Sequence, residues 1–550
     1  MARLKFVALS GTTGVTENLY VYEYGDDMIV VDCGVGFPES EMHGVDLVIP
    51  DFGYIVRNKK KLRGIVITHG HEDHLGAVPF LLREVKAPVY GTRLTAGFIE
   101  DKLRDYDMPV SAVKVFNPDS DKLKLGRFTV QGFRVSHSVP DTIGLAIDTP
   151  EGRVFHVADY KFDWAPVDGR PFDVGKAAIL AKDGVLALAS DSLGSTSVGY
   201  TQSESAIEPK IEAIIREAKG QVYFTTISSN ISRMQQAIWV AERLGRKVAF
   251  VGRSIQKKAD IAEGLGLLEY PKGVVVDLRD AKRLHKDKVV YIVAGSYGQP
   301  GSALYRVSMN EHKHVGIDPG DTVIFSGDPA PPGSKTNVDA LVDQLFDIGV
   351  DVHYYDLQED LHVSGHGSIQ DIMMLFGIVK PKYFIPIGGT VRHMRGYSLL
   401  AQKMGAKESQ VFELMPGDSI EFGRGEAKKG ESIIVHEALL DGLEVGDVGN
   451  VVLRDRNVLA KEGVVVAIAQ FDRNTRKIPG TPDLISRGFV FEKVKKDFLI
   501  KSGEKMMNSL NKRQIRKPHI LKSEIIGYLE NYFYQETGRR PMILPVVVEV

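Results

Sequence analysis

The most constraining feature of the sequence is the segment THGHEDH at residues 68–74, which directly follows the apolar run GIVI. It places His69, His71, Asp73 and His74 in one strand-to-helix turn. Imidazole and carboxylate groups are ligands that suit Zn²⁺ or Mn²⁺. A histidine-rich surface turn is the alternative, but four potential ligands directly after a buried strand favour metal binding. We expect His69 and His71 to hold one ion, with Asp73 and His74 directed at a neighbouring one.

The first two hundred residues alternate short, β-branched apolar runs with turns, as expected of strands. Two of these runs end in a histidine and two in an aspartate, which suggests a sheet with a site along one edge. The runs lie at residues 19–25, 28–34, 64–70, 127–137 and 153–160. Residues 73–85 have helical spacing, with Leu75, Val78, Leu81, Leu82 and Val85 on one side.

From about residue 206 the pattern changes to alternating helices and strands, which predicts a parallel α/β unit inserted into the chain. Strand character resumes at residues 381–389. Residues 425–450, rich in Gly and Glu, resemble a connector. A last α/β segment follows, with a strand at 463–471 and a helix near 517–536.

Composition limits the class of protein. A chain of 550 residues is too long for one hydrophobic core, so we expect two to four domains. No apolar run approaches the roughly 18–20 residues that span a bilayer. The apolar stretch in the opening segment MARLKFVALSG is shorter than a secretory signal requires. A single cysteine, Cys33, excludes an internal disulfide framework and fits a reducing compartment. We therefore expect a cytoplasmic protein without a membrane partner.

The formal net charge of −2 favours neither nucleic acid nor any other partner. Residues 451–550 carry 19 Lys and Arg against 11 Asp and Glu. This excess fits a solvated basic face at least as well as a binding surface. A polyanionic substrate would require a locally positive channel within the acidic remainder of the chain.

The motif HxHxDH resembles the signature of the metallo-β-lactamase superfamily, an αβ/βα sandwich with a dinuclear metal site between its sheets. Three further residues fit that pattern in order. Asp32, in VVDCG, matches an aspartate at the end of an early strand that supports the metal ligands without binding the ions. His137, in RVSHSVPD, matches the next ligand, and Asp159, in HVADYKFD, matches the carboxylate that bridges the two ions.

The inserted α/β unit resembles the β-CASP domain of superfamily members that act on nucleic acids, with Asp191 in LASDSLGST and His366 in HVSGHGS as its motifs. Phrases along the whole chain, among them ITHGHEDHLGAVPFLL, DVGNVVLRDR and RRPMILPVVVEV, resemble ribonuclease J. The implied fold class is α/β. Its implied domains are a metallo-β-lactamase domain in two parts (1–205 and 362–430), a β-CASP domain (206–361), a linker (431–455) and a C-terminal oligomerisation domain (456–550).

Ribonuclease J enzymes degrade and process RNA by 5′-to-3′ exonuclease and endonuclease action and prefer a 5′-monophosphate end. The resemblance implies up to two Zn²⁺ ions, with Mn²⁺ or Mg²⁺ as alternatives. It assigns His69, His71, His137 and Asp159 to the first ion, and Asp73, His74 and the shared Asp159 to the second. Asp191 would orient metal ligands. His366 would donate a proton to the leaving 3′ oxygen, unless it is a loop histidine that satisfies backbone groups.

The resemblance also implies a grip on the 5′-phosphate of single-stranded RNA. The loop SGHGS (364–368) has the composition of an anion-binding turn. Together with the TTISSN region it implicates Ser364, Gly365, His366, Ser228 and Ser229. Arg253 would meet the RNA backbone, with a structural ion pair as an equal alternative. The glycine cluster SGTTGV at residues 10–15 departs from the family's GGxGEIG, and we expect only a tight turn there.

One departure concerns the metal site itself. Ribonuclease J presents a ligand histidine in a phrase like IPVHGEYRHL, whereas this chain reads FIPIGGTVRHM, with Gly388 in place of that histidine and Thr390 in place of the glutamate. His393 matches the ordinary downstream histidine. The second ion would be completed by water or substrate, or the site would favour Mn²⁺ or Mg²⁺. Alternatively, the chain is a weakly active or noncatalytic RNA-binding subunit.

The family resemblance further implies a homodimer or homotetramer, or a hetero-oligomer with a paralogue. A small-molecule metallohydrolase such as a thioesterase is a third reading of the motif. That reading leaves the β-CASP insert and the C-terminal domain without a purpose. The intact first ligand set favours the hypothesis of a functional nuclease.

Overall fold

The structure is a computed structural model that describes residues 2–39, 41–327, 334–355, 361–441, 444–445, 450–489, 495–513 and 517–550. The chain divides into two compact units. The first comprises Met1–Phe37 and Leu47–Ala438, and the second comprises Pro38–Asp46 and Leu439–Val550. No helix among the described residues is long and apolar enough to cross a membrane.

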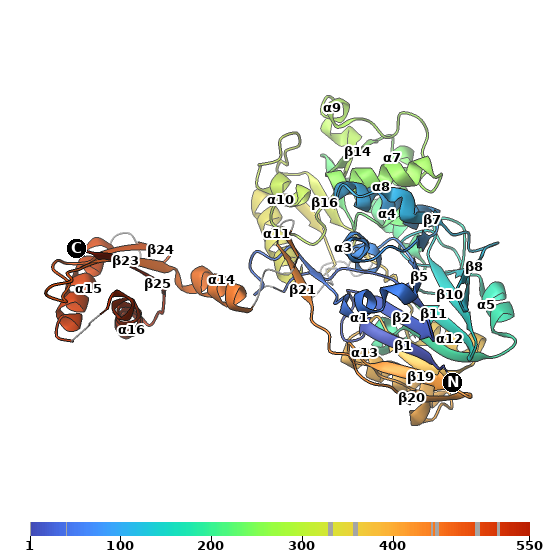
Figure 1. Ribbon diagram of the computed structural model, residues 1–550. Coiled ribbons are helices and arrows are strands. Elements are labelled where there is room, and N and C mark those ends of the chain that lie inside the picture. Colours follow the sequence, from blue (N-terminus) through green and yellow to red (C-terminus); the bar gives the residue numbers. More distant parts are fainter. Residues whose placement is uncertain are drawn as a thin grey trace. The chain divides into compact units, whose positions relative to one another are not determined.

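Two mixed sheets form the body of the first unit (Figure 1). The eight-stranded sheet has the order β20 (Glu426–Lys429), β19 (Ser419–Gly423), β1 (Leu4–Ser10), β2 (Leu19–Tyr24), β3 (Asp27–Val31), β5 (Leu62–Val66), β6 (Val89–Gly91) and β7 (Val113–Val115). The six-stranded sheet has the order β18 (Pro381–Ile387), β12 (Val185–Asp191), β11 (Gly152–Val157), β10 (Ile143–Thr149), β9 (Phe128–Arg134) and β8 (Lys122–Leu125).

Alternation along these strands buries one shared core between the two sheets, as the period of two predicts. Phe6 and Tyr22 enter it from the eight-stranded sheet, and Leu145 and Ile385 from the six-stranded sheet. The outer face of the six-stranded sheet packs on α5 (Val174–Ala181), α12 (Ile369–Val379) and α13 (Val391–Lys403). The expected sandwich is thereby confirmed.

The inserted unit is a five-stranded parallel sheet in the order β14 (Lys247–Val251), β15 (Val289–Val293), β13 (Val222–Thr225), β16 (Thr322–Phe325) and β17 (Asp351–His353). Its helices are α6 (Glu208–Glu217), α7 (Ile231–Arg243), α8 (Arg253–Gly264), α9 (Leu278–Ala281), α10 (Ala303–Ser308) and α11 (Ser334–Ile348) (Figure 1). The three inner strands, β13, β15 and β16, are buried along their whole length, as is typical of a parallel sheet with helices on both faces.

The remaining helices of the first unit are α1 (Gly53–Arg57), α2 (Glu72–Leu75), α3 (Val78–Glu84) and α4 (Arg93–Asp105). The single helix expected over residues 73–85 is wrong, because it is interrupted between Leu75 and Val78. Pro79 stands in the first turn of α3, where its missing N–H costs no hydrogen bond. The break ends the metal-binding turn with its own short helix.

In the second unit, β24 (Asp483–Arg487), β23 (Val464–Phe471) and β25 (Met542–Glu549) form a sheet, as the sequence predicted for β23. The helices are α14 (Asn450–Glu462), α15 (Lys495–Leu510) and α16 (Pro518–Thr537). Val465, Ala467 and Ile543 face α15 and α16 and build a separate core. The first unit also contains the short strand β4 (Leu47–Ile49). The short strands β21 (Ala438–Asp441) and β22 (Glu444–Val445) lie within residues 425–450, so this segment is not merely a connector.

Candidate metal centre

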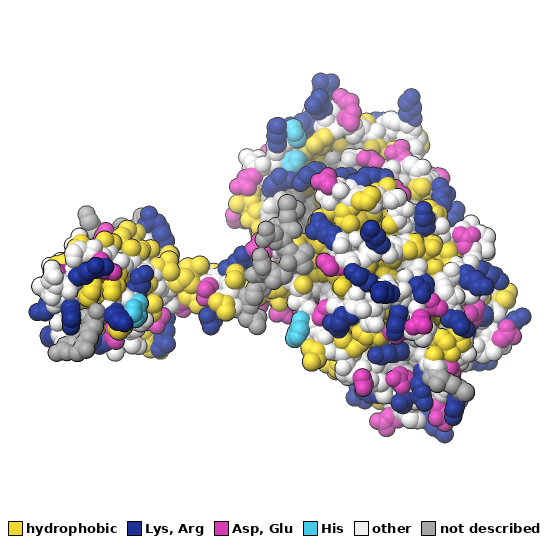
Figure 2. Space-filling model, viewed as in Figure 1, with side chains coloured by type: hydrophobic (Ala, Val, Ile, Leu, Met, Phe, Trp, Pro, Cys, Tyr) yellow, Lys and Arg dark blue, Asp and Glu magenta, His cyan; other side chains and the backbone are white. Residues whose placement is uncertain are grey.

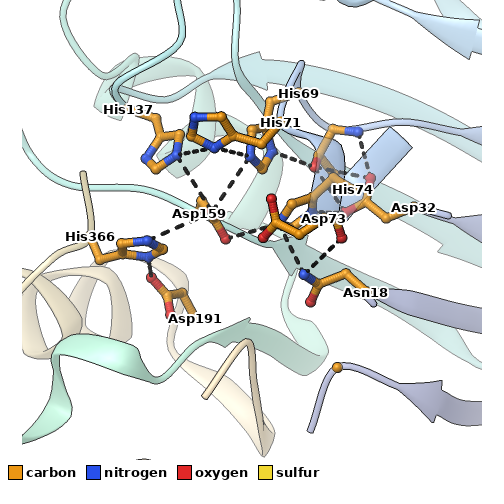
Figure 3. Close-up of polar contacts among 12 residues, drawn as sticks. Asn18, Asp32, His69, His71, Asp73, His74, His137, Asp159, Asp191 and His366 are labelled. Atoms are coloured by element: carbon orange, nitrogen blue, oxygen red, sulfur yellow. Dashed lines mark hydrogen bonds and ion pairs between the residues drawn. The ribbon is translucent and has the colours of Figure 1, made fainter. Parts of the chain in front are cut away.

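The predicted ligands converge at the ends of strands from both sheets (Figure 3). The turn after β5 carries His69 and His71, the segment after β9 carries His137, and the segment after β11 carries Asp159. Parallel and antiparallel strands of the two sheets end at one edge of the sandwich, which explains why residues so distant in sequence meet. All these side chains except that of His71 are buried.

The first ligand set consists of three imidazoles and one carboxylate. His71 Nδ1 lies 3.1 Å from both His69 Nε2 and His137 Nε2. Asp159 Oδ2 lies 3.5 Å from the same two Nε2 atoms. Ligand atoms around a tetrahedral zinc ion, with bonds of roughly 2.0–2.1 Å, lie about 3.3 Å apart. The donor atoms therefore fit a divalent ion in spacing as well as in chemistry.

The second set shares Asp159 with the first. Its other oxygen, Oδ1, lies 3.5 Å from His74 Nε2, which is 3.4 Å from Asp73 Oδ2. Asp159 thus directs one oxygen to each ligand set, the arrangement of a bridging carboxylate. The second set offers three protein donors among the described residues, whereas the first offers four.

Asp32 holds the turn from behind. Its buried carboxylate accepts hydrogen bonds from the Thr68 amide at 2.8 Å and lies 2.8 Å from His74 Nδ1. That contact fixes the His74 ring with Nε2 facing the second set, as a carboxylate behind a metal-bound histidine commonly does. Asp32 has a φ of +60°, a conformation that few residues other than glycine tolerate.

Electrostatics keep the first set ready for a cation. Burial and the neighbouring His69 lower the pKa of His71 to about 3. Burial also lowers the pKa of His137 well below its usual range. Both rings are therefore neutral at physiological pH, the form that coordinates metal ions. Burial opposes ionisation of Asp159, but the facing His74 and His366 outweigh it and hold the pKa of Asp159 well below its usual range.

His366 reaches the same centre from the loop before α12. Its Nδ1 lies 2.7 Å from Asp191 Oδ2, and its Nε2 lies 3.8 Å from Asp159 Oδ2. Burial disfavours the charged ring, but the carboxylates of Asp191 and Asp159 outweigh burial and raise the pKa of His366 to about 9. The carboxylate of Asp191 contacts the His366 ring, and with Asp159 these two residues form a third group of donor atoms that could hold an ion. The role that we expected for Asp191, the orientation of metal ligands, stays a prediction.

The predicted phosphate-binding residues fall in two places. Gly365 accepts a hydrogen bond through its carbonyl from the His137 ring at 2.7 Å, and Ser364 Oγ accepts one from the His366 amide. Ser228 bonds Ser254 at 3.0 Å, at the start of α8. Ser229 is buried, and Arg253 is exposed at the first position of α8. Their roles remain predictions.

Gly388 follows β18 beside Asp191. Its φ is +66°, and its amide donates to the Gly11 carbonyl at 2.8 Å. A Cβ added there would lie 3.4 Å from Asp191 Oδ1 and would meet no closer atom. A Cβ at this position therefore meets only ordinary contacts, although the positive φ strains any residue other than glycine. Thr390 and His393 are both used in capping α13, so His393 does not replace the missing ligand.

The sequence did not single out Asn18, which precedes β2. Its Nδ2 lies 3.1 Å from His74 Nε2 and donates to the Asp73 carbonyl at 3.1 Å, while its Oδ1 accepts from the Tyr20 hydroxyl. The only feature of the sequence that could have indicated its place at the metal centre is that Asn18 is a polar residue between a glycine-rich turn and an apolar strand.

Comparison with known proteins agrees with this geometry. Residues 12–193 match the metallo-β-lactamase superfamily, residues 219–345 the ribonuclease J β-CASP domain, residues 356–411 a Zn-dependent metallo-hydrolase RNA specificity domain, and residues 451–550 the ribonuclease J C-terminal domain. A crystal structure of a protein of unknown function from Enterococcus faecalis V583 shares the fold. It has a TM-score of 0.50 at 14% identity, over 76% of this chain and 100% of that one.

Full-length relatives are also found. Ribonuclease J 1 of Streptococcus pyogenes serotype M3 is 36% identical over 98% of this chain and 97% of its own length. Ribonuclease J2 of Bacillus subtilis is 34% identical over 100% of this chain and 99% of its own. Together with the ligand sets built around Asp159, these matches establish that the chain belongs to the ribonuclease J family of metallohydrolases that act on RNA.

Proposed function

We propose that this chain is a metal-dependent ribonuclease that hydrolyses single-stranded RNA from the 5′ end, prefers a 5′-monophosphate and also cleaves internally. The observation that carries the proposal is the position of Asp159, which directs one oxygen to each of two ligand sets while His366 lies 3.8 Å away. RNA decay and maturation in the cytoplasm are the setting that we infer.

The chemistry divides between ions and side chains. Divalent ions held by the two sets would activate water and neutralise charge on the attacked phosphate, with zinc as the expected metal. His366, protonated at neutral pH, faces the same centre and would give its Nε2 proton to the leaving 3′ oxygen. Asp191 would hold that ring through Nδ1 and keep it charged.

The Gly388 position shapes the metal preference. With three protein donors, the second set would bind its ion more weakly than the first. Water or substrate phosphate would complete it, which suits Mn²⁺ or Mg²⁺ as well as zinc. The same observation favours a second candidate function, a weakly active or noncatalytic RNA-binding subunit that pairs with an active paralogue.

Self-association has a surface to support it. Helices cover one face of the β23–β25 sheet, and the opposite face exposes Ile485, Leu544, Val546 and Val548 (Figure 2 shows the hydrophobic side chains of this unit). Contiguous exposed apolar faces commonly mark protein interfaces. We infer that a second copy of the chain covers this face in a homodimer or homotetramer.

Cleavage of 5′-monophosphate and 5′-triphosphate RNA by the metal-loaded chain tests the proposal. The expected result is release of nucleotides from the 5′ end, faster for the monophosphate, and loss of cleavage in His71→Ala. RNA that stays intact with every metal, while still binding, would favour the noncatalytic subunit. Equal cleavage rates for the 5′-monophosphate and the 5′-triphosphate RNA would reject only the preference for a 5′-monophosphate.

A further inference from the structure

Two exposed aromatic side chains stand out on the surface of the first unit. Trp164 is 60% exposed and Tyr200 is 61% exposed. Every other Phe, Tyr or Trp side chain among the described residues is less than half exposed, the nearest being Tyr534 at 49%. Single exposed apolar side chains are common, but two large exposed rings on neighbouring segments are a candidate binding surface.

Both rings lie on segments tied to the loop of His366 by one buried carboxylate. Asp371 accepts hydrogen bonds from the backbone amides of Phe162 at 3.0 Å, Thr201 at 2.9 Å and Ser368 at 3.0 Å. Trp164 is two residues from the first of these amides and Tyr200 one residue from the second. His366 is two residues from the third, so one carboxylate fixes the backbone close to all three residues.

Further contacts keep the two aromatic segments together. Ser203 Oγ donates to the Ala165 carbonyl at 2.9 Å, next to Trp164. The Thr201 hydroxyl donates to the His366 carbonyl at 2.8 Å, next to Tyr200. Residues 166 and 167, directly after the Trp164 segment, line the same crevice as the metal ligand His137.

The Trp164 ring is itself supported from beneath. It stacks on Phe162 with ring centroids 6.1 Å apart and planes inclined by 28°, and Phe162 stacks on buried Phe172 at 4.3 Å. A ring held by a stack of two others presents a preorganised flat surface. Preorganisation lowers the entropy cost of binding a further ring.

We propose that Trp164 and Tyr200 form a stacking platform for bases of the single-stranded RNA beside the catalytic centre. Base stacking on aromatic side chains is sequence-tolerant, because every base has a π-face. The platform would hold the strand by its bases, while phosphates are bound elsewhere. The inference deepens the proposed function, since it names how that substrate is held.

The chain offers a direct probe, because Trp164 and Trp239 are its two tryptophans. In the full-length Trp239→Phe variant, the fluorescence reports Trp164 alone. The ligand is a 5′-monophosphorylated RNA decamer with phosphorothioate linkages that resist cleavage, and the control ligand is an abasic strand with the same phosphates. We expect the base-containing strand to quench Trp164 fluorescence and the abasic strand to leave it unchanged.

Binding measured by fluorescence anisotropy supplies the second readout. Trp164→Ala and Tyr200→Ala should each weaken decamer binding by about fivefold or more, without changing the dependence of affinity on salt, which reports phosphate contacts. Trp164→Phe should recover most of the loss. The exposed Phe346→Ala in α11 is the matched control and should change nothing.

Unchanged Trp164 fluorescence with the decamer bound to saturation would overturn the platform, as would wild-type affinity in both alanine variants. If the chain cleaves RNA but bound RNA does not quench Trp164 fluorescence, the platform is rejected and the proposed function stands. A chain whose Trp164 is quenched but which never cleaves rejects the nuclease activity and supports the platform.

Discussion

Replacing Asp191 with asparagine should move the alkaline limit of RNA cleavage toward neutral pH. Asp191 Oδ2 lies 2.7 Å from His366 Nδ1, and with Asp159 it raises the pKa of His366 to about 9. A carboxylate at this distance commonly changes a neighbouring pKa by about 1–3 units. Asparagine keeps the size of the side chain and removes its charge, so the pKa of His366 should fall to roughly 6–8.

The expected change in rate follows from the protonated fraction. A proton donor acts only while it holds its proton, so activity is retained below its pKa and lost as pH rises through it. With a pKa of about 7 instead of about 9, the protonated fraction at pH 8 falls about tenfold, whereas at pH 6 it falls by only about 10%. Bound cations lower the pKa in both proteins, so the separation between them is the quantity to measure.

The assay is kcat/KM for a 5′-monophosphate RNA from pH 5.5 to 10 at saturating Mn²⁺. His366→Gln should lose the alkaline limb and about 10²–10⁴-fold in rate. Asp183→Asn, which removes an exposed carboxylate outside this centre, is the matched control. Thermal melting of each variant separates misfolding from chemistry. An alkaline limb that stays in place in Asp191→Asn, or that persists in His366→Gln, would refute the assignment of His366 as the proton donor.

Three further outcomes are expected. Gly388→His should bind the second ion at least about tenfold more tightly than Gly388→Ala, a control that has the same strained φ but offers no ligand. Equal affinities of the two variants, or two tightly bound ions in the unmodified chain, would contradict this. Arg233→Met should lower the free energy of unfolding by about 3–5 kcal/mol, because it leaves the buried Glu204 carboxylate without its ion-pair partner at 2.7 Å. Adding Glu204→Met should recover most of that loss. If denaturant titration finds that the effects of the two substitutions simply add, Arg233 and Glu204 are not energetically coupled. Val546→Lys should convert the oligomer to a monomer in light scattering, and an unchanged mass would reject the proposed interface.

The sequence predicted the first ligand set because the HxHxDH motif is local and its companions follow at strand ends. Alternation and helical spacing, which are properties of short segments, also predicted the inserted parallel sheet and the C-terminal unit. The sandwich itself was implied by the resemblance to the metallo-β-lactamase superfamily. The helical spacing of residues 73–85 did not reveal that α2 and α3 are separate helices, because the apolar residues of two successive helices can keep one common spacing.

Long-range polar contacts were beyond sequence reasoning. Asp371 holds amides 170 and 209 residues away, and nothing in the local sequence distinguishes it from an ordinary helix-capping residue. Asp191 was expected to orient metal ligands, and the sequence did not indicate its contact with His366, 175 residues further along. The sequence showed that Gly388 replaces a ligand, but only the structure shows that this glycine has a positive φ and lies beside Asp191.

Metal occupancy and RNA cleavage measured in the same samples test the two-ion centre most directly. The metal-free chain is titrated with Zn²⁺ or Mn²⁺, bound metal per chain is measured, and cleavage of 5′-monophosphate RNA is followed at each step. We predict that the first equivalent binds tightly with little cleavage and that cleavage rises with the weaker second equivalent. Maximal cleavage with one ion per chain, or no cleavage with both ligand sets filled, would contradict a centre in which Asp159 serves two ions.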